Sequence, residues 1–143
     1  MIVESDVLVR PDTLQGLIDG AAARPDCALA AAITVDKSGA VNYPYEKQAC
    51  SEPVATKHHL SFCCTLMTNA FLQQADFDAL DSSKSWFDVP ISHMGRSNGF
   101  CNYLFGNLRV FHQPHSSRPW KQLKYTHPLK YYFYKWFKGR DKI

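Results

Sequence analysis

The first nine residues, Met1-Ile2-Val3-Glu4-Ser5-Asp6-Val7-Leu8-Val9, contain the pattern that decides the fold class. The apolar residues of Ile2–Val9 are mostly β-branched, and such a run predicts a central strand covered on both faces. Glu4 and Asp6 lie two positions apart, so in a strand their carboxylates point to one side. At the C-terminal end of a strand, that side faces the crevice where open α/β sheets bind ligands. A solvated strand end explains the same pair without any ligand.

The next segments alternate helix and strand. Pro11 and Asp12 predict the start of a helix, and Arg24-Pro25-Asp26 predicts its end. Cys27–Val35 predicts a second buried strand, closed by the turn Asp36-Lys37-Ser38-Gly39. A strand, a helix and a strand in succession predict parallel pairing in an α/β sheet.

The middle of the chain predicts shorter elements around one long loop. Asn42–Lys57 contains two prolines and no hydrophobic period, so we expect a binding loop or lid there. The fold class predicted from all segments is α/β, with a mixed, mostly parallel sheet flanked by helices and a C-terminal amphipathic helix. The remaining expected elements are a strand at Leu60–Met67, a short helix at Thr68–Gln74, a polar loop at Phe77–Lys84, a helix from Trp86 to Arg96 with Pro90 in its first turn, strands at Gly99–Tyr103 and Leu108–His112, and a helix from Leu129.

Charge is distributed unevenly along the 143 residues. The chain carries a formal charge of +3, but residues 118–143 hold eight Lys or Arg, one Asp and eight aromatic residues. This tail is therefore at about +7 and the preceding residues at about −4. We divide the chain into a body, residues 1–117, and a basic aromatic tail, residues 118–143. A helix in the tail can pack on the body or lie on an anionic membrane surface, whereas the acidic body argues against nucleic acid as its partner.

The cysteines and the N-terminus indicate a reducing compartment. The five cysteines form no CxxC pair, which favours reduced thiols over a disulfide framework. The pairs His58-His59 and Cys63-Cys64 are poorly spaced for a tetrahedral zinc site. The first residues lack the basic and apolar regions of a signal peptide, and no run of 18 apolar residues exists. We expect a cytoplasmic protein, with the inner face of the membrane as the alternative position.

Several segments, in the same order along the chain, resemble elements of the family 2 glycosyltransferases, whose fold is called GT-A. The resemblance covers roughly Val3 to His115. Its parts are the stretch from Val3 to Leu14, similar to the family's metal-site strand and following helix; Phe62 to Leu72, similar to its next core strand; Asp76-Phe77-Asp78, similar to its "gFD" segment; Trp86 to Ser92, similar to the acidic segment before its acceptor helix; Arg96 to Phe100, similar to the end of that helix; and Arg109-Val110-Phe111-His112, similar to a strand that ends in a histidine.

The resemblance implies a role for each matching residue. Asp6 would be the metal ligand, and Glu4 its partner towards the ribose or the metal. Asp88 would be the catalytic base that accepts the proton of the acceptor hydroxyl. His112, or alternatively His115, would contact the metal or the diphosphate. The implied cofactor is Mg²⁺ or Mn²⁺, because the carboxylate oxygens are hard ligands.

The implied activity is inverting transfer of a sugar from a nucleotide-sugar donor to a hydroxyl of a glycan or a lipid-linked acceptor. The match covers the metal-site and acceptor half of the family's fold, not the half that binds the base. Glu4 stands where the family usually has Asp, and Phe87 where a second acid precedes the base. Residues 113–120 lack the spacing of the QxxRW box, which favours non-processive transfer. Two alternatives stay open: Asp88 as an ordinary helix cap, and the whole chain as a non-catalytic α/β remnant.

Overall fold

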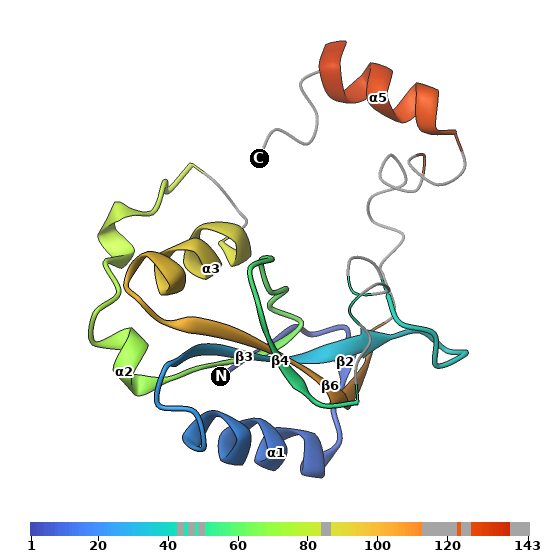
Figure 1. The fold of residues 1–143 in the computed structure, drawn as a ribbon. Helices are drawn as coiled ribbons and strands as arrows, with labels where there is room; N and C mark the ends of the chain where they lie inside the picture. The colour runs from blue at the N-terminus through green and yellow to red at the C-terminus, as the bar shows by residue number, and fades with distance from the viewer. Residues whose placement is uncertain are drawn as a thin grey trace. The chain divides into compact units, whose positions relative to one another are not determined.

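The computed structural model describes residues 1–42, 45, 48, 51–83, 87–112, 123 and 127–137. The chain divides into two compact units, Met1–Gln113 and Pro114–Ile143. The first unit contains a six-stranded mixed sheet with helices on both faces (Figure 1). The predicted α/β class with a mixed sheet flanked by helices is therefore confirmed.

The elements of the first unit follow the order strand, strand, helix, strand, strand, strand, helix, helix, strand. Their bounds are β1 Ile2–Val3, β2 Val7–Leu8, α1 Pro11–Ala22, β3 Cys27–Val35, β4 Pro53–Thr56, β5 Cys64–Met67, α2 Asn69–Leu72, a 3-10 turn at Phe77–Ala79, α3 Asp88–Ser97 and β6 Cys101–His112.

The centre of the sheet is β3, which has the bounds that the sequence predicts. All nine of its residues are buried, because β5 and β6 flank it and helices cover both of its faces. On one face Leu17 of α1 packs in a cluster with Ala30 and Phe105. On the other face Phe71 of α2 and Ile91 of α3 pack in a second cluster. These two apolar layers fix the positions of α1 and α3 relative to the sheet.

The longest strand is β6, which spans twelve residues where the sequence predicts two short strands. It pairs with β3 in parallel, and its other edge pairs with β4 and, near its end, with β2. An irregularity opposite Ala32/Ile33 absorbs three extra β6 residues between Phe105 and Arg109, and the pairing then resumes. The expected loop Asn42–Lys57 contains β4, so this part of the prediction is wrong.

Two further expectations about the sheet are wrong. Ile2–Val9 is not one buried central strand but two strands of two residues, joined by a turn at Glu4–Asp6. The side chains of Val3 and Leu8 are 43% and 70% exposed, because β1 and β2 stand at the ends of the strand order β1-β5-β3-β6-β2. The sheet is also not mostly parallel: of the five strand pairings among the described residues, the pair β3–β6 is parallel and the other four are antiparallel.

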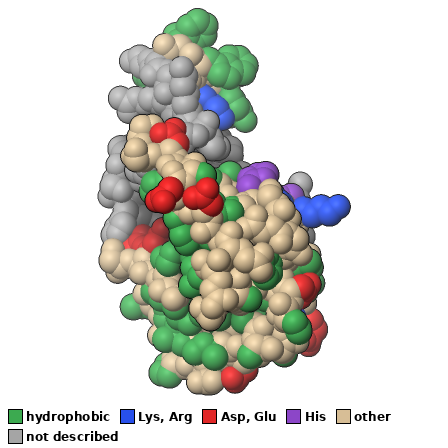
Figure 2. All heavy atoms as spheres, turned by 90° about the vertical axis from the view of Figure 1, so that its left-hand side faces the viewer, with side chains coloured by type: hydrophobic (Ala, Val, Ile, Leu, Met, Phe, Trp, Pro, Cys, Tyr) green, Lys and Arg blue, Asp and Glu red, His purple; other side chains and the backbone are tan. Residues whose placement is uncertain are grey.

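Much of one face of the molecule is uncharged. Figure 2 shows one face of the molecule, on which apolar and uncharged groups predominate and acidic side chains lie in separate patches. An ion pair joins Arg10 and Asp12, both of which are well exposed. An exposed pair of this kind contributes little to stability, whereas burial of the two apolar clusters is the main contribution to the fold.

The second unit contains the predicted C-terminal helix, α5, at Pro128–Phe137. Tyr131 is buried, whereas Leu129, Trp136 and Phe137 are 88%, 74% and 75% exposed. Among the residues that the structure describes, no helix is both long enough and apolar enough to cross a bilayer.

Candidate metal centre

The turn between β1 and β2 carries the two carboxylates of the N-terminal pattern. The Val7 N–H donates to the Glu4 carbonyl oxygen at 3.2 Å, and the Glu4 N–H donates to the Cys63 carbonyl oxygen at 3.0 Å. Since β1 pairs with β5 and β2 pairs with β6, the turn joins the two ends of the strand order. Glu4 is therefore fixed beside the residues that precede β5, and Asp6 beside the end of β6.

Asp6 and His112 are in direct contact although they are 106 positions apart. The Nε2 atom of His112 lies 3.1 Å from Oδ2 of Asp6. The pairing of Val7 with His112 in the β2–β6 ladder produces this contact, because Asp6 immediately precedes Val7. The two side chains are 13% and 19% exposed for Asp6 and His112, so water screens their interaction only in part.

Glu4 contacts Cys63, a residue that the sequence analysis set aside as a zinc ligand. The thiol donates to Oε2 of Glu4 at 3.2 Å, and its Sγ atom also lies 3.0 Å from Oγ of Ser61. Cys63 is buried, with 5% of its surface exposed. The pKa of the Cys63 thiol is raised to about 12, mainly by burial and also by the nearby carboxylates of Glu4 and Asp6, while the hydrogen bond with Ser61 opposes the shift.

Asp88, the predicted base, lies at the first position of α3 and is half-buried. Its Oδ1 atom accepts from the N–H of Val89 at 2.9 Å. Tyr45 connects this region with the thiol, because its hydroxyl accepts from the Ser61 N–H at 2.5 Å. Burial is the main cause that raises the pKa of Tyr45, and the charges of Cys63 and Asp88 add to it. Cys63 and Asp88 are therefore both close enough to the Tyr45 hydroxyl to interact with it electrostatically.

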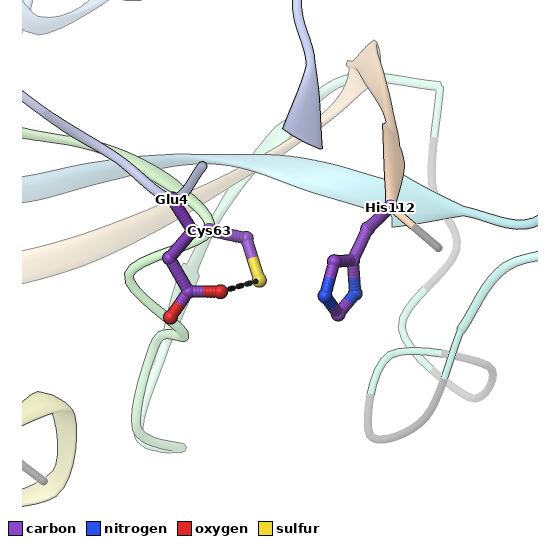
Figure 3. Close-up of side chains that lie close together, drawn as sticks. All are labelled: Glu4, Cys63 and His112. Carbon is purple, nitrogen blue, oxygen red and sulfur yellow. Dashed lines mark hydrogen bonds between the residues drawn. The ribbon is translucent and has the colours of Figure 1, made fainter. Parts of the chain in front are cut away.

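Three ligand types converge in this region. Among the described residues, Glu4, Cys63 and His112 place one ligand atom each so that all three lie within 4.8 Å of one another (Figure 3). Asp6 joins them through its contact with His112. We call Glu4, Asp6, Cys63 and His112 the four-residue cluster. Its side chains come from the N-terminal turn, the segment before β5 and the end of β6.

The cluster has the chemistry of a divalent-cation site. Two carboxylates, an imidazole and a thiol are all groups that bind metal ions in proteins. Each group is now held by a hydrogen bond to a second member, in the pairs Asp6–His112 and Glu4–Cys63. A cation bound by these groups would replace the two hydrogen bonds.

The structure brings some predicted residues together and leaves others apart. Glu4, Asp6 and His112 meet, whereas the Asp88 carboxylate accepts a hydrogen bond from the Val89 N–H within its own helix. His115 lies outside the described residues. Sequence reasoning weighed Cys63 only together with Cys64 and the pair His58-His59 and set that zinc site aside, because no spacing rule relates position 63 to positions 4 and 112. The resemblance gave Asp6 and His112 a common metal, and strand pairing brings these two residues into contact.

We compared the chain with models of protein families, with curated proteins and with solved structures, and none of the three comparisons found a match.

Proposed function

We propose that this chain is the metal-site and acceptor half of a family 2 glycosyltransferase with a GT-A fold. The proposal combines the sequence resemblance with one structural observation, the 3.1 Å contact between Asp6 and His112. The resemblance implies that both residues contact the metal or the diphosphate of the donor. Asp6 belongs to the first turn of the unit, and His112 belongs to its last strand. Their meeting in space supports a common role, because their separation along the chain does not require it.

The donor set fits one of the two predicted cations better than the other. Carboxylate oxygens and an imidazole, as in Glu4, Asp6 and His112, suit Mn²⁺. Mg²⁺ prefers an octahedral shell of oxygens, into which the thiol of Cys63 does not fit. A divalent cation at the cluster would supply positive charge to the departing diphosphate.

Asp88 would act on the other substrate. Transfer with inversion needs a carboxylate within hydrogen-bond reach of the attacking hydroxyl. The Val89 N–H bonds to Oδ1 and so orients the Asp88 carboxylate, and Oδ2 is the atom that would accept the hydroxyl proton. The position of Asp88 in the first turn of α3 adds favourable N–H dipoles beside the anion. Glu4, Asp6 and His112 would hold the donor while Asp88 receives the proton.

The test measures sugar transfer from a panel of labelled nucleotide-diphospho-sugars to glycan and lipid-linked acceptors by the intact enzyme, in which this chain is combined with the half that binds the nucleotide base, in the presence of Mn²⁺. Asp88→Asn should lower the rate by about 10²–10⁴-fold, the usual contribution of a general base, and leave donor binding unchanged. Asp19→Asn, which changes an exposed carboxylate on α1, is the matched control and should transfer at the wild-type rate. Equal loss of donor binding in Asp88→Asn would remove Asp88 from this role. Transfer that persists in a chelator would remove Asp6 from the metal.

A second candidate function is peripheral association of α5 with an anionic bilayer surface. The observation that favours it is the exposure of large apolar side chains along this helix, including Trp136 and Phe137. Lys130 and Lys135 lie on the same helix, and aromatic rings with nearby cations suit the interface of an anionic membrane. A lipid-linked sugar acceptor would be reached from such a surface.

Sedimentation with lipid vesicles tests this second candidate. The chain should bind vesicles that contain an anionic lipid, bind zwitterionic vesicles weakly, and lose binding as salt is raised. Trp136→Ala should weaken binding, whereas Leu8→Ala, which removes an exposed apolar side chain from β2, should not. Equal effects of the two substitutions would exclude α5 as the membrane contact.

A further inference from the structure

We propose that Cys63 is a metal ligand and that the four-residue cluster prefers a zinc-class cation, Zn²⁺ or Co²⁺, over Mg²⁺. The proposal rests on the proposed function only in placing a divalent cation at the same site. It does not require sugar transfer, because a thiolate–metal bond can form whether or not the chain binds a donor.

Two contacts within the cluster are close to the distance between neighbouring ligand atoms of a tetrahedral site. With Zn–S near 2.3 Å and Zn–N or Zn–O near 2.0–2.1 Å, two ligand atoms on one tetrahedral ion are separated by about 3.3–3.6 Å. The two hydrogen-bonded pairs measure 3.2 Å for Cys63–Glu4 and 3.1 Å for His112–Asp6. The ligand atoms of Glu4, Cys63 and His112 all lie within 4.8 Å of one another, so they need to move closer together to surround one ion.

The ligand types select the cation. Thiolate and imidazole are the borderline and soft ligands that bind Zn²⁺ strongly, and they bind Mg²⁺ poorly. On binding, the S–H bond of Cys63 breaks, its proton leaves to solvent, and the sulfur electron pair forms the bond to the ion. Two carboxylates and one thiolate carry three negative charges, of which a divalent cation neutralises two.

The surroundings of Cys63 hold the sulfur in place. Ser61 contacts Sγ at 3.0 Å and its backbone N–H donates to the buried hydroxyl of Tyr45. The Glu4 N–H also bonds to the Cys63 carbonyl oxygen, so the backbones of these two residues are fixed to each other. Contacts of this kind around a ligand orient it and commonly change metal affinity by about 10–100-fold.

The experiment is a titration of the full-length, reduced chain with Co²⁺, followed by its absorption spectrum. A cobalt–thiolate bond gives a charge-transfer band in the near ultraviolet, which carboxylate and imidazole ligands do not give. We expect one equivalent of Co²⁺ to produce this band and one equivalent of Zn²⁺ to abolish it, whereas excess Mg²⁺ leaves it unchanged. Cys63→Ser should lose the band. Cys101→Ser, at the opposite end of β6 from His112, should keep it.

A measurement on the unmodified protein tests the same ligand without depending on whether the Cys63 variant folds. X-ray absorption of the zinc-loaded wild-type chain should show a sulfur ligand at about 2.3 Å. A shell of nitrogen and oxygen alone would overturn the proposal, as would a cobalt band that survives in a folded Cys63→Ser protein. Binding of pyrophosphate with Mn²⁺, measured on the same preparation, separates this outcome from the fate of the transferase. A cobalt band without pyrophosphate binding supports the thiolate ligand and contradicts the transferase. Pyrophosphate binding without a cobalt band supports the transferase and contradicts the thiolate ligand.

Discussion

The substitution Ser92→Ala tests how the segment before β5 is held against α3. The Oγ atom of Ser92 accepts from the Leu60 N–H at 3.0 Å, and both residues are 0% exposed. Alanine removes the acceptor but leaves the donor buried, which costs about 1–3 kcal/mol of unfolding free energy. The bond matters for the site because Leu60 lies three positions before Cys63 and Ser92 four positions after Asp88.

The loss of unfolding free energy corresponds to a decrease in the melting temperature. The first unit contains 113 residues, Met1–Gln113. At about 2.1 cal/mol/K for each residue, its unfolding entropy is about 0.24 kcal/mol/K, so a loss of 1–3 kcal/mol lowers the Tm by about 4–13 °C. Thermal unfolding followed by circular dichroism, with chemical denaturation as a second measure, tests this value. The Asn102 side chain donates to the Ser92 carbonyl oxygen at 2.8 Å, and that bond survives the substitution.

Ser97→Ala is the matched control, because Ser97 lies at the exposed end of the same helix. Its effect should stay within about 0.5 kcal/mol, as for most surface substitutions. If Ser92→Ala is no less stable than Ser97→Ala, the buried hydrogen bond does not anchor this segment and the reasoning is refuted.

Two further predictions concern packing and thiol reactivity. A Cβ atom at Gly20 would lie 2.2 Å from Cε1 of the buried Phe105 ring, so Gly20→Ala should destabilise the first unit by about 1–3 kcal/mol in denaturant unfolding. The control is Gly16→Ala on the same helix, whose new methyl group meets only the movable end of Leu108 and should be nearly neutral. Equal effects of the two substitutions would contradict this account. A pKa of about 12 for Cys63 means that the thiolate fraction at pH 8 is about three orders of magnitude below that of a free cysteine. Alkylation followed by mass spectrometry should therefore be correspondingly slow at Cys63 in the folded chain and fast in denaturant, with the rate rising as pH rises towards this pKa; equal rates in both states would show that the thiol is not buried.

Local patterns predicted the elements that burial dictates. β3 has the predicted bounds because a continuous apolar run with β-branched residues at its end is typical of a strand that is buried on both faces. The helix α3 begins within the predicted range because Pro90 fits a first helical turn. β4 was missed because it begins with Pro53 and two of its four residues are exposed; such a segment pairs only as an edge strand and has no clear hydrophobic signal.

The N-terminal prediction failed for a different reason. Ile2–Val9 has the composition of a buried strand, but composition does not specify which strands are neighbours. Three successive polar residues, Glu4 to Asp6, form a turn instead, and the apolar residues on either side pair with different strands. Pairing across the sheet also created the contacts of the four-residue cluster. Cys63 entered the cluster through this long-range arrangement, which no local spacing in the sequence encodes.

The most direct test of the central claim, that the N-terminal turn and the end of β6 hold a divalent cation that binds a diphosphate, is equilibrium binding of pyrophosphate to the full-length chain. We predict binding in the presence of Mn²⁺, loss of binding in a chelator, and a weakening of at least about tenfold in Asp6→Asn and His112→Gln, equivalent to about 1.4 kcal/mol. Asp88→Asn should bind as the wild type does. Binding that is unaffected by the chelator, or unchanged in Asp6→Asn, would contradict the account.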